Sequence, residues 1–173
     1  SIWAETIFAI KELNPNCNVE VLTPDFKAHE PSIIKVLNAK PHIFSHNVET
    51  VKRISKLVRP NSDWDRTKKV LKMSVESGLV TKTGLMVGLG ETDQEVLETM
   101  KIMADLGVSI FNIGQYLQST IKHLPVDRFV HPDVFDLYKK EGTKYGFKVV
   151  ESGPLVRSSY HAASQANELN GLA

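Results

Sequence analysis

The sequence contains a single cysteine, Cys17, among its 173 residues. One thiol cannot form an internal disulfide, and it cannot by itself hold a zinc ion or an iron–sulfur cluster. No apolar run approaches the roughly 18 residues of a membrane span, and the first residues lack a basic segment followed by an apolar core and a cleavage site. We therefore expect a soluble chain, and any metal chemistry would take most of its ligands from elsewhere.

No charge of one sign dominates, because 21 Lys and Arg residues stand against 20 Asp and Glu residues, a net charge of +1. This balance creates no strong field that favours nucleic acid or an anionic membrane. The composition, 42% hydrophobic and 24% charged, is typical of one globular domain with a sizeable core. Charge alone identifies no partner.

Short β-branched runs alternate with longer helical patterns, and Trp3, Ile7 and Ile10 share one face of an opening helix. The strands are predicted at 19–23, 42–45, 83–88, 109–113 and 147–150. The later helices are predicted at 31–37, 48–58 with Asn47 as N-cap, 63–76 after a Ser62 cap, 92–106 with a Thr92–Glu95 capping box, and from His131 onward. This order predicts an α/β fold with a parallel sheet, most simply part of a barrel.

Five strands are too few for a closed eight-stranded barrel, which takes ~250 residues. The chain also opens within an amphipathic helix, with no initiator Met and no earlier strand for that helix to cover. We expect a fragment of a longer protein, or an open barrel whose N-terminal strands are missing. A processed mature terminus is the alternative.

The carboxyl ends of parallel strands converge on one face, where such folds place their working residues. Polar residues follow nearly every predicted strand. Asn47 and Glu49 could be only a helix cap with an acid in the first turn, and the Gly88–Gly90 turn alone is a weak sign of a nucleotide. Glu91 lies next to two glycines, so its carboxylate could accept hydrogen bonds from an amine or a ribose hydroxyl.

Five separated blocks of sequence resemble the lipoyl synthases, a family of radical S-adenosylmethionine enzymes. The blocks are Glu20–Phe26, His46–Val51, Lys82–Glu91, Gly114–Gln118 with His123–Val126, and Ser152–Ala162. They follow the family's order and cover nearly the whole chain, and the Arg-Ser-Ser-Tyr segment is itself a hallmark of the family.

The resemblance implies a partial (β/α) TIM-like barrel of the radical SAM type, two 4Fe-4S clusters and S-adenosyl-L-methionine. One cluster would cleave S-adenosylmethionine to a radical that removes hydrogen from C6 and C8 of a protein-bound octanoyl-lysine, and the auxiliary cluster would donate the sulfur. The cofactor has to supply this step because unactivated C–H bonds offer nothing to ordinary side chains.

The implied partners are an octanoylated lipoyl carrier protein, either the H protein or an E2 lipoyl domain, and a reductant such as ferredoxin or flavodoxin. Nucleic acid and membranes are not among them. The implied location is the cytoplasm, or the mitochondrial or plastid matrix in a eukaryote.

Five residues correspond by resemblance to the S-adenosylmethionine site. Asn47 and Glu49 would face the ribose and methionine parts of the cofactor, and Arg59 would lie near the methionine carboxylate. Gly88 and Glu91 would line the same site after the next strand. No catalytic acid, base or nucleophile is assigned in this chain.

Ser158 and Ser159 resemble the segment whose serine oxygen binds the auxiliary cluster, and Ser159 is favoured. An oxygen ligand suits this soft site less well than a thiolate, so the iron should leave more readily. The family's two cysteine triplets are absent, and Ser119 replaces the usual proline after Gln118.

We therefore expect residues 1–173 to be the C-terminal portion of one barrel domain, inactive alone, with 147–173 as a C-terminal extension that carries the Arg-Ser-Ser-Tyr motif. Two other functions stay open. One is a metal-free α/β-barrel enzyme such as an aldolase or isomerase, but Lys82 enters its strand at the wrong end for a Schiff base. The other is a short non-catalytic relative that binds the lipoyl carrier protein.

Overall fold

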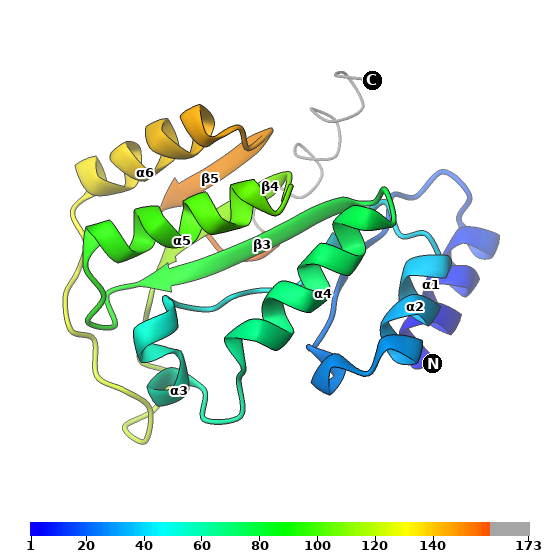
Figure 1. The fold of residues 1–173 in the computed structure, drawn as a ribbon, viewed down its shortest axis with the longest axis horizontal. Coiled ribbons are helices and arrows are strands. Elements are labelled where there is room, and N and C mark those ends of the chain that lie inside the picture. The colour runs from blue at the N-terminus through cyan, green and yellow to red at the C-terminus, as the bar shows by residue number, and fades with distance from the viewer. Residues whose placement is uncertain (160–173) are drawn as a thin grey trace.

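The computed structural model describes residues 1–159, which form a parallel sheet covered by helices on one face (Figure 1). Within these residues the sheet has five strands, which lie side by side in chain order. They are β1 (Glu20–Leu22), β2 (Ile43–Ser45), β3 (Val80–Val87), β4 (Ile110–Gln115) and β5 (Val149–Gly153). Sequential parallel strands joined by helices are the arrangement of a (β/α) barrel that has been left open, which confirms the predicted fold class.

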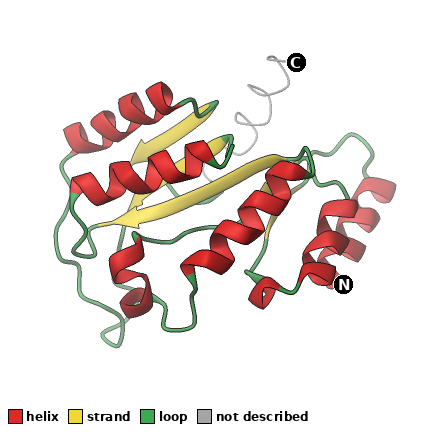
Figure 2. Cartoon of the chain, viewed as in Figure 1, coloured by secondary structure: helices red, strands yellow, loops and turns green. Residues whose placement is uncertain are grey.

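The helices alternate with the strands, and Figure 2 shows them gathered on one side of the sheet. They are α1 (Ile2–Leu13), α2 (Glu30–Asn38), α3 (Ser55–Val58), α4 (Trp64–Glu76), α5 (Asp93–Asp105) and α6 (Pro132–Tyr145), with short 3₁₀ turns η1 (Phe26–Ala28) and η2 (Lys52–Ile54). None of these helices is long and apolar enough to cross a membrane.

The helix starts are fixed by local capping chemistry. The predicted capping box is confirmed, since the Thr92 hydroxyl accepts from the Glu95 amide and the Glu95 carboxylate accepts from the Thr92 amide. The Ser62 cap is wrong. Asp63 takes that role, and its carboxylate accepts hydrogen bonds from the amides of Asp65 and Arg66, both at 3.0 Å.

The predicted helix from Val48 to Val58, capped by Asn47, is also wrong. The Glu49 amide donates to the Gly84 carbonyl at 3.1 Å, and the Met86 amide donates to the Glu49 carbonyl at 2.8 Å. These bonds hold the chain alongside β3 and commit the amide and carbonyl of Glu49 to that strand, so neither can join a helix. Helical structure therefore begins only at η2 and continues into α3.

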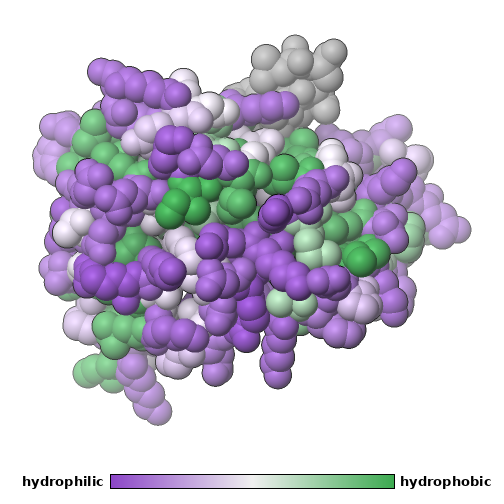
Figure 3. Space-filling view, in the orientation of Figure 1, coloured by the Kyte–Doolittle hydropathy of each residue, from purple (hydrophilic) through white to green (hydrophobic). Residues whose placement is uncertain are grey.

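Alternate residues of each strand form the core with the helices. Phe111 and Ile113 of β4 pack with Met100 of α5 and Phe135 of α6, and all four side chains are buried. Phe44 of β2 joins a second apolar cluster with α1, α2 and α4. The outer face of the molecule is mostly hydrophilic, with small groups of hydrophobic residues between the polar ones (Figure 3).

The remaining strand residues point to the opposite, inner face of the sheet. There Lys82 is only 1% exposed, and its ammonium lies 3.0 Å from a Glu20 carboxylate oxygen on β1. Lys82 is the third residue of β3, so it lies toward the amino end of the strand, as the sequence predicts. It is an ion-paired residue remote from the carboxyl edge of the sheet, which weighs against a Schiff-base role.

Residues that follow β5 fold back across this inner face. Asn112 of β4 donates through Nδ2 to the carbonyls of Arg157 and Ser158, at 3.2 and 3.4 Å. A Cβ at Gly114 would overlap the Val156 carbonyl oxygen. Only a glycine on β4 allows the returning segment to lie this close to the sheet.

Substitution of Gly114 by alanine should force the returning segment away from the sheet and lower stability by about 1–3 kcal/mol, as overpacking does. Gly153→Ala is the matched control, because a Cβ there would lie 3.6 Å from a Val156 methyl group, an ordinary contact. Urea unfolding of the two variants and the parent checks this. Equal stabilities for the two variants would contradict the proposed crowding at Gly114.

Candidate functional site

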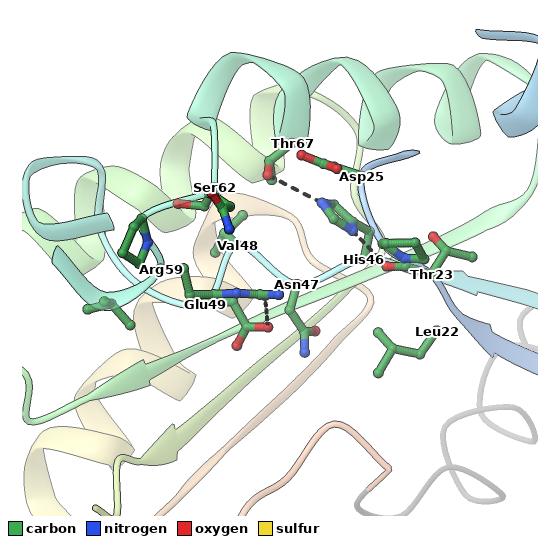
Figure 4. A pocket seen from close by; sticks show the side chains of 14 residues that line it. Leu22, Thr23, Asp25, His46, Asn47, Val48, Glu49, Arg59, Ser62 and Thr67 are labelled. Atoms are coloured by element: carbon green, nitrogen blue, oxygen red, sulfur yellow. Dashed lines mark hydrogen bonds and ion pairs between the residues drawn. The ribbon is translucent and has the colours of Figure 1, made fainter. Parts of the chain in front are cut away.

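Two cavities lie at the carboxyl ends and inner face of the sheet. The first, here called the strand-end cavity, has a volume of 630 Å³ and opens where β1 and β2 end (Figure 4). The second, here called the inner cavity, has a volume of 380 Å³ and lies against the inner face of β3 and β4. Asn47 and Glu49 line both cavities, so the chain after β2 forms the wall between them.

Glu49 adopts a left-handed backbone conformation with φ of +68°. This conformation is uncommon for a residue with a side chain, and it persists where surrounding structure enforces it. The two backbone bonds to β3 provide that enforcement. As a result the Glu49 carboxylate projects into the strand-end cavity next to Asn47 (Figure 4).

The Glu49 carboxylate is paired with Arg59, whose Nη1 lies 2.7 Å from Oε1. Burial raises the pKa of the Glu49 carboxyl group, and the Arg59 guanidinium opposes that shift. Arg59 directly follows α3 and remains more than half exposed, at 58% of its side chain. The pair offers an acceptor for hydroxyl or ammonium donors beside a cation that can bind a carboxylate.

His46 forms the deeper wall of the strand-end cavity. Its Nδ1 donates to the Thr23 carbonyl at 2.9 Å, which leaves Nε2 to accept from the Thr67 hydroxyl at 3.2 Å. Burial lowers the pKa of the imidazole, because the charged form would lose its hydration. A neutral His46 thus ties the ends of β1 and β2 to α4, which keeps the cavity open in one shape (Figure 4).

Gly88 and Glu91 lie at the end of β3, and neither lines these two cavities. Both oxygens of the buried Glu91 carboxylate accept backbone hydrogen bonds, from Gly88 at 2.7 Å and Leu89 at 2.9 Å. Gly88 has φ of +97°, and a side chain there would overlap Gln115 and the Arg128 carbonyl. In this structure the Glu91 carboxylate holds its own turn closed. Its role toward a ligand would therefore be indirect, through the conformation of this turn.

Ser158 lines the inner cavity, and Ser159 follows it on the exposed surface. Tyr160 and His161, which complete the Arg-Ser-Ser-Tyr-His block, lie outside the described residues. Cys17 is exposed in the connection between α1 and β1. Among residues 1–159 no three His, Cys, Asp or Glu side chains are close enough together to hold a metal ion.

Sequence reasoning underestimated two residues. It did not name His46 as a site residue, whereas the structure places this side chain in the wall of the strand-end cavity. It did not single out Asn112, which borders the inner cavity. The available signal was an amide residue between the apolar Phe111 and Ile113 of one strand, where a buried polar group needs a partner.

The neutral state of His46 predicts a pH-dependent stability. The folded pKa is below the ordinary value of about 6.5, so the unfolded chain takes up the proton first as pH falls. The contribution of neutral His46 to the free energy of unfolding is complete above about pH 6.5. It is lost as the pH falls toward the folded pKa, by up to about 1.4 kcal/mol per pH unit.

Urea unfolding of the parent and of His46→Asn at several pH values between 5 and 8 measures this contribution. The asparagine keeps a donor toward Thr23 but does not titrate, so its profile should be flatter by the stated slope. Parallel profiles for the two proteins would contradict a buried neutral imidazole.

Comparison with known families agrees with this architecture. Residues 3–103 match the radical SAM superfamily. A domain of the pyruvate-formate lyase-activating enzyme from Bacteroides vulgatus shares the fold, with a TM-score of 0.66 at 14% sequence identity. That likeness covers 88% of this chain and 92% of the other.

Curated relatives are much more similar in sequence. A lipoyl synthase from Treponema denticola is 49% identical over 162 residues, which cover 94% of this chain and 56% of the relative. A lipoyl synthase from Rubrobacter xylanophilus is 49% identical over 170 residues, which cover 97% of this chain and 53% of the relative. The chain thus spans about half the length of the relatives it matches. It belongs to the radical SAM superfamily, and it resembles curated lipoyl synthases along nearly its whole length.

Proposed function

We propose that this chain is the C-terminal part of a lipoyl synthase, which inserts two sulfur atoms at C6 and C8 of a protein-bound octanoyl-lysine to give the lipoyl cofactor. The sequence similarity supports the family, and one observation supports the site. The Glu49–Arg59 pair, set beside Asn47 on a left-handed backbone turn, presents opposite charges at the carboxyl edge of a parallel sheet.

The residues of the strand-end cavity fit S-adenosyl-L-methionine. Glu49 and Asn47 would accept hydrogen bonds from ribose hydroxyls or the ammonium group, and Arg59 would bind the methionine carboxylate. The Thr23 hydroxyl, buried in the same wall and without a hydrogen-bond partner among residues 1–159, offers one more polar contact. When bound, the cofactor supplies the hydrogen-abstracting chemistry that unactivated C–H bonds require.

Side chains of this chain fix the shape of the site and the charge within it before a ligand binds. His46 keeps the ends of β1 and β2 joined to α4, and Glu91 keeps the turn after β3 closed. Arg59 lowers the cost of keeping the partly buried Glu49 carboxylate ionised. A polar ligand would therefore meet groups that are already oriented, which reduces the ordering cost of binding.

The residues of this chain do not by themselves fit a 4Fe-4S cluster. Its one cysteine is exposed and far in the sequence from the proposed serine ligands. We assign Ser159, with Ser158 as the alternative, as an oxygen ligand of an auxiliary cluster whose cysteine ligands lie outside this sequence. On this proposal the chain alone holds neither cluster and is inactive.

The proposed substrate is an octanoylated lipoyl carrier protein, the H protein or an E2 lipoyl domain, and the proposed electron source is ferredoxin or flavodoxin. These assignments follow from the resemblance to lipoyl synthases. A metal-free barrel enzyme is disfavoured because Lys82 is committed to Glu20 on the inner face, away from both cavities.

Equilibrium dialysis of radiolabelled S-adenosylmethionine against the 173-residue chain tests the cofactor assignment. Glu49→Gln removes a charged acceptor and should weaken binding by about tenfold or more, since hydrogen bonds to charged groups contribute about 1.5–3 kcal/mol. Arg59→Met should weaken S-adenosylmethionine more than methylthioadenosine, which lacks the carboxylate.

Glu98→Gln is the matched control, because Glu98 lies on α5 and accepts a hydrogen bond from Gln94 of the same helix. It should bind S-adenosylmethionine as the parent does. Equal affinity in the Glu49 variant and this control would reject the strand-end cavity as the cofactor site.

A further inference from the structure

The inner cavity contains a buried polar atom that the proposed cofactor site does not use. Asn112 is 4% exposed and borders this cavity from β4. Its Nδ2 donates to two carbonyl oxygens, whereas its Oδ1 has no hydrogen-bond partner among the described residues. A buried carbonyl oxygen without a partner costs free energy, so native proteins seldom retain one without a reason.

The orientation of the Asn112 amide is fixed by its neighbours. If the amide were rotated by half a turn, Oδ1 would face the carbonyl oxygens of Arg157 and Ser158, and all three atoms are acceptors. The unrotated orientation is therefore the stable one, and it leaves Oδ1 as the group that still requires a donor.

We propose that Asn112 is a specificity-determining residue whose Oδ1 accepts a hydrogen bond from the amide N–H of an acyl-lysine bound in the inner cavity. The inference rests on the proposed function, since it takes the acyl-lysine class of substrate from there. It adds the contact by which this chain distinguishes an amide-linked acyl group from other acyl compounds.

The surroundings of Asn112 favour an uncharged donor. Arg157 Nη1 lies 3.4 Å from the position that a Cβ of Gly114 would occupy, so its guanidinium sits over the same face of β4. A ligand ammonium in this position would be repelled by that charge, and the Glu49 carboxylate, which also lines the cavity, is already paired with Arg59. A secondary amide brings a donor without charge, and Met86, Leu117 and Val156 give the cavity apolar walls for an alkyl chain.

The same side chain connects the ligand to the serine segment. Nδ2 of Asn112 holds the backbone of Arg157 and Ser158, and Ser158 itself lines the cavity. An N–H bonded to Oδ1 polarises the amide and strengthens the two bonds that Nδ2 donates. Recognition of the substrate amide and placement of the serine segment thus depend on one residue.

Two small probes separate the N–H from the rest of the ligand. The first is an Nα-acetyl-N6-octanoyl-lysine amide, and the second is its ester isostere, in which oxygen replaces the side-chain N–H. Isothermal titration on the 173-residue chain should give a dissociation constant about three- to tenfold lower for the amide, the contribution of one neutral hydrogen bond.

Asn112→Leu has no acceptor and should bind the two probes with equal affinity. Asn112→Asp retains an acceptor and should recover a preference for the amide, which a purely structural role of the side chain would not predict. Asn38→Leu, at the exposed end of α2, makes the same exchange away from the cavity and should keep the parental preference.

A parental chain without preference, or a preference that survives in Asn112→Leu, would overturn the inference and leave the proposed function standing. Binding of neither probe would overturn both the inference and the proposed substrate. Titration of S-adenosylmethionine on the same samples reports on the cofactor site separately. An amide preference without cofactor binding would reject the cofactor assignment and leave the inference about Asn112 standing.

Discussion

The pairing of the Glu49 backbone with β3 is the constraint on which the site depends. Two hydrogen bonds, to Gly84 and Met86, hold the residue in a left-handed conformation after β2 has ended. Without them the chain would continue into a helix, as its local sequence favours. The carboxylate would then lie on a helix surface, and the wall between the two cavities would be lost.

The inner face of the sheet is packed differently at its two ends. At its amino end, Ile43, Ile110 and Val149 form a small apolar cluster that closes the bottom. Toward the carboxyl end, Gly84 and Gly114 place no side chain on the inner face. The segment that returns after β5 lies in the space at Gly114. The inner face is therefore closely packed at the amino ends of the strands and open at their carboxyl ends, where a ligand would enter.

Much of this architecture could be predicted from the sequence. Hydrophobic runs and caps such as Thr92 with Glu95 are local signals, so the strands and most helices were predicted within a few residues. The segment at 48–51 was mispredicted because its conformation depends on backbone groups of β3, more than 30 residues away. Local propensity contains no information about such a partner.

The candidate site was predicted less completely. Placing Asn47, Glu49 and Arg59 at one cavity required the family resemblance, and the structure then brought them together. Glu91 was expected to face a ligand because it lies next to glycines, but those glycines allow the chain to fold back onto its carboxylate. The orphan acceptor on Asn112 could not be foreseen, since a sequence does not reveal which end of an amide finds a partner.

One further contact determines how the loops of the site respond to solution conditions. Arg53 of η2 binds both oxygens of Glu95, at 2.6 and 2.9 Å, and also the Gly90 carbonyl. The Arg53 guanidinium, with the backbone amide and the hydroxyl of Thr92, lowers the pKa of Glu95 to about 2, so the link between the two loops remains ionised in all but strong acid. The Arg53 side chain is 56% exposed and that of Glu95 is 24% exposed, so water and dissolved salt reach the pair and screen its attraction. Ionic strength, and not acidity, is therefore the variable that loosens the connection between the loop after β2 and the loop after β3.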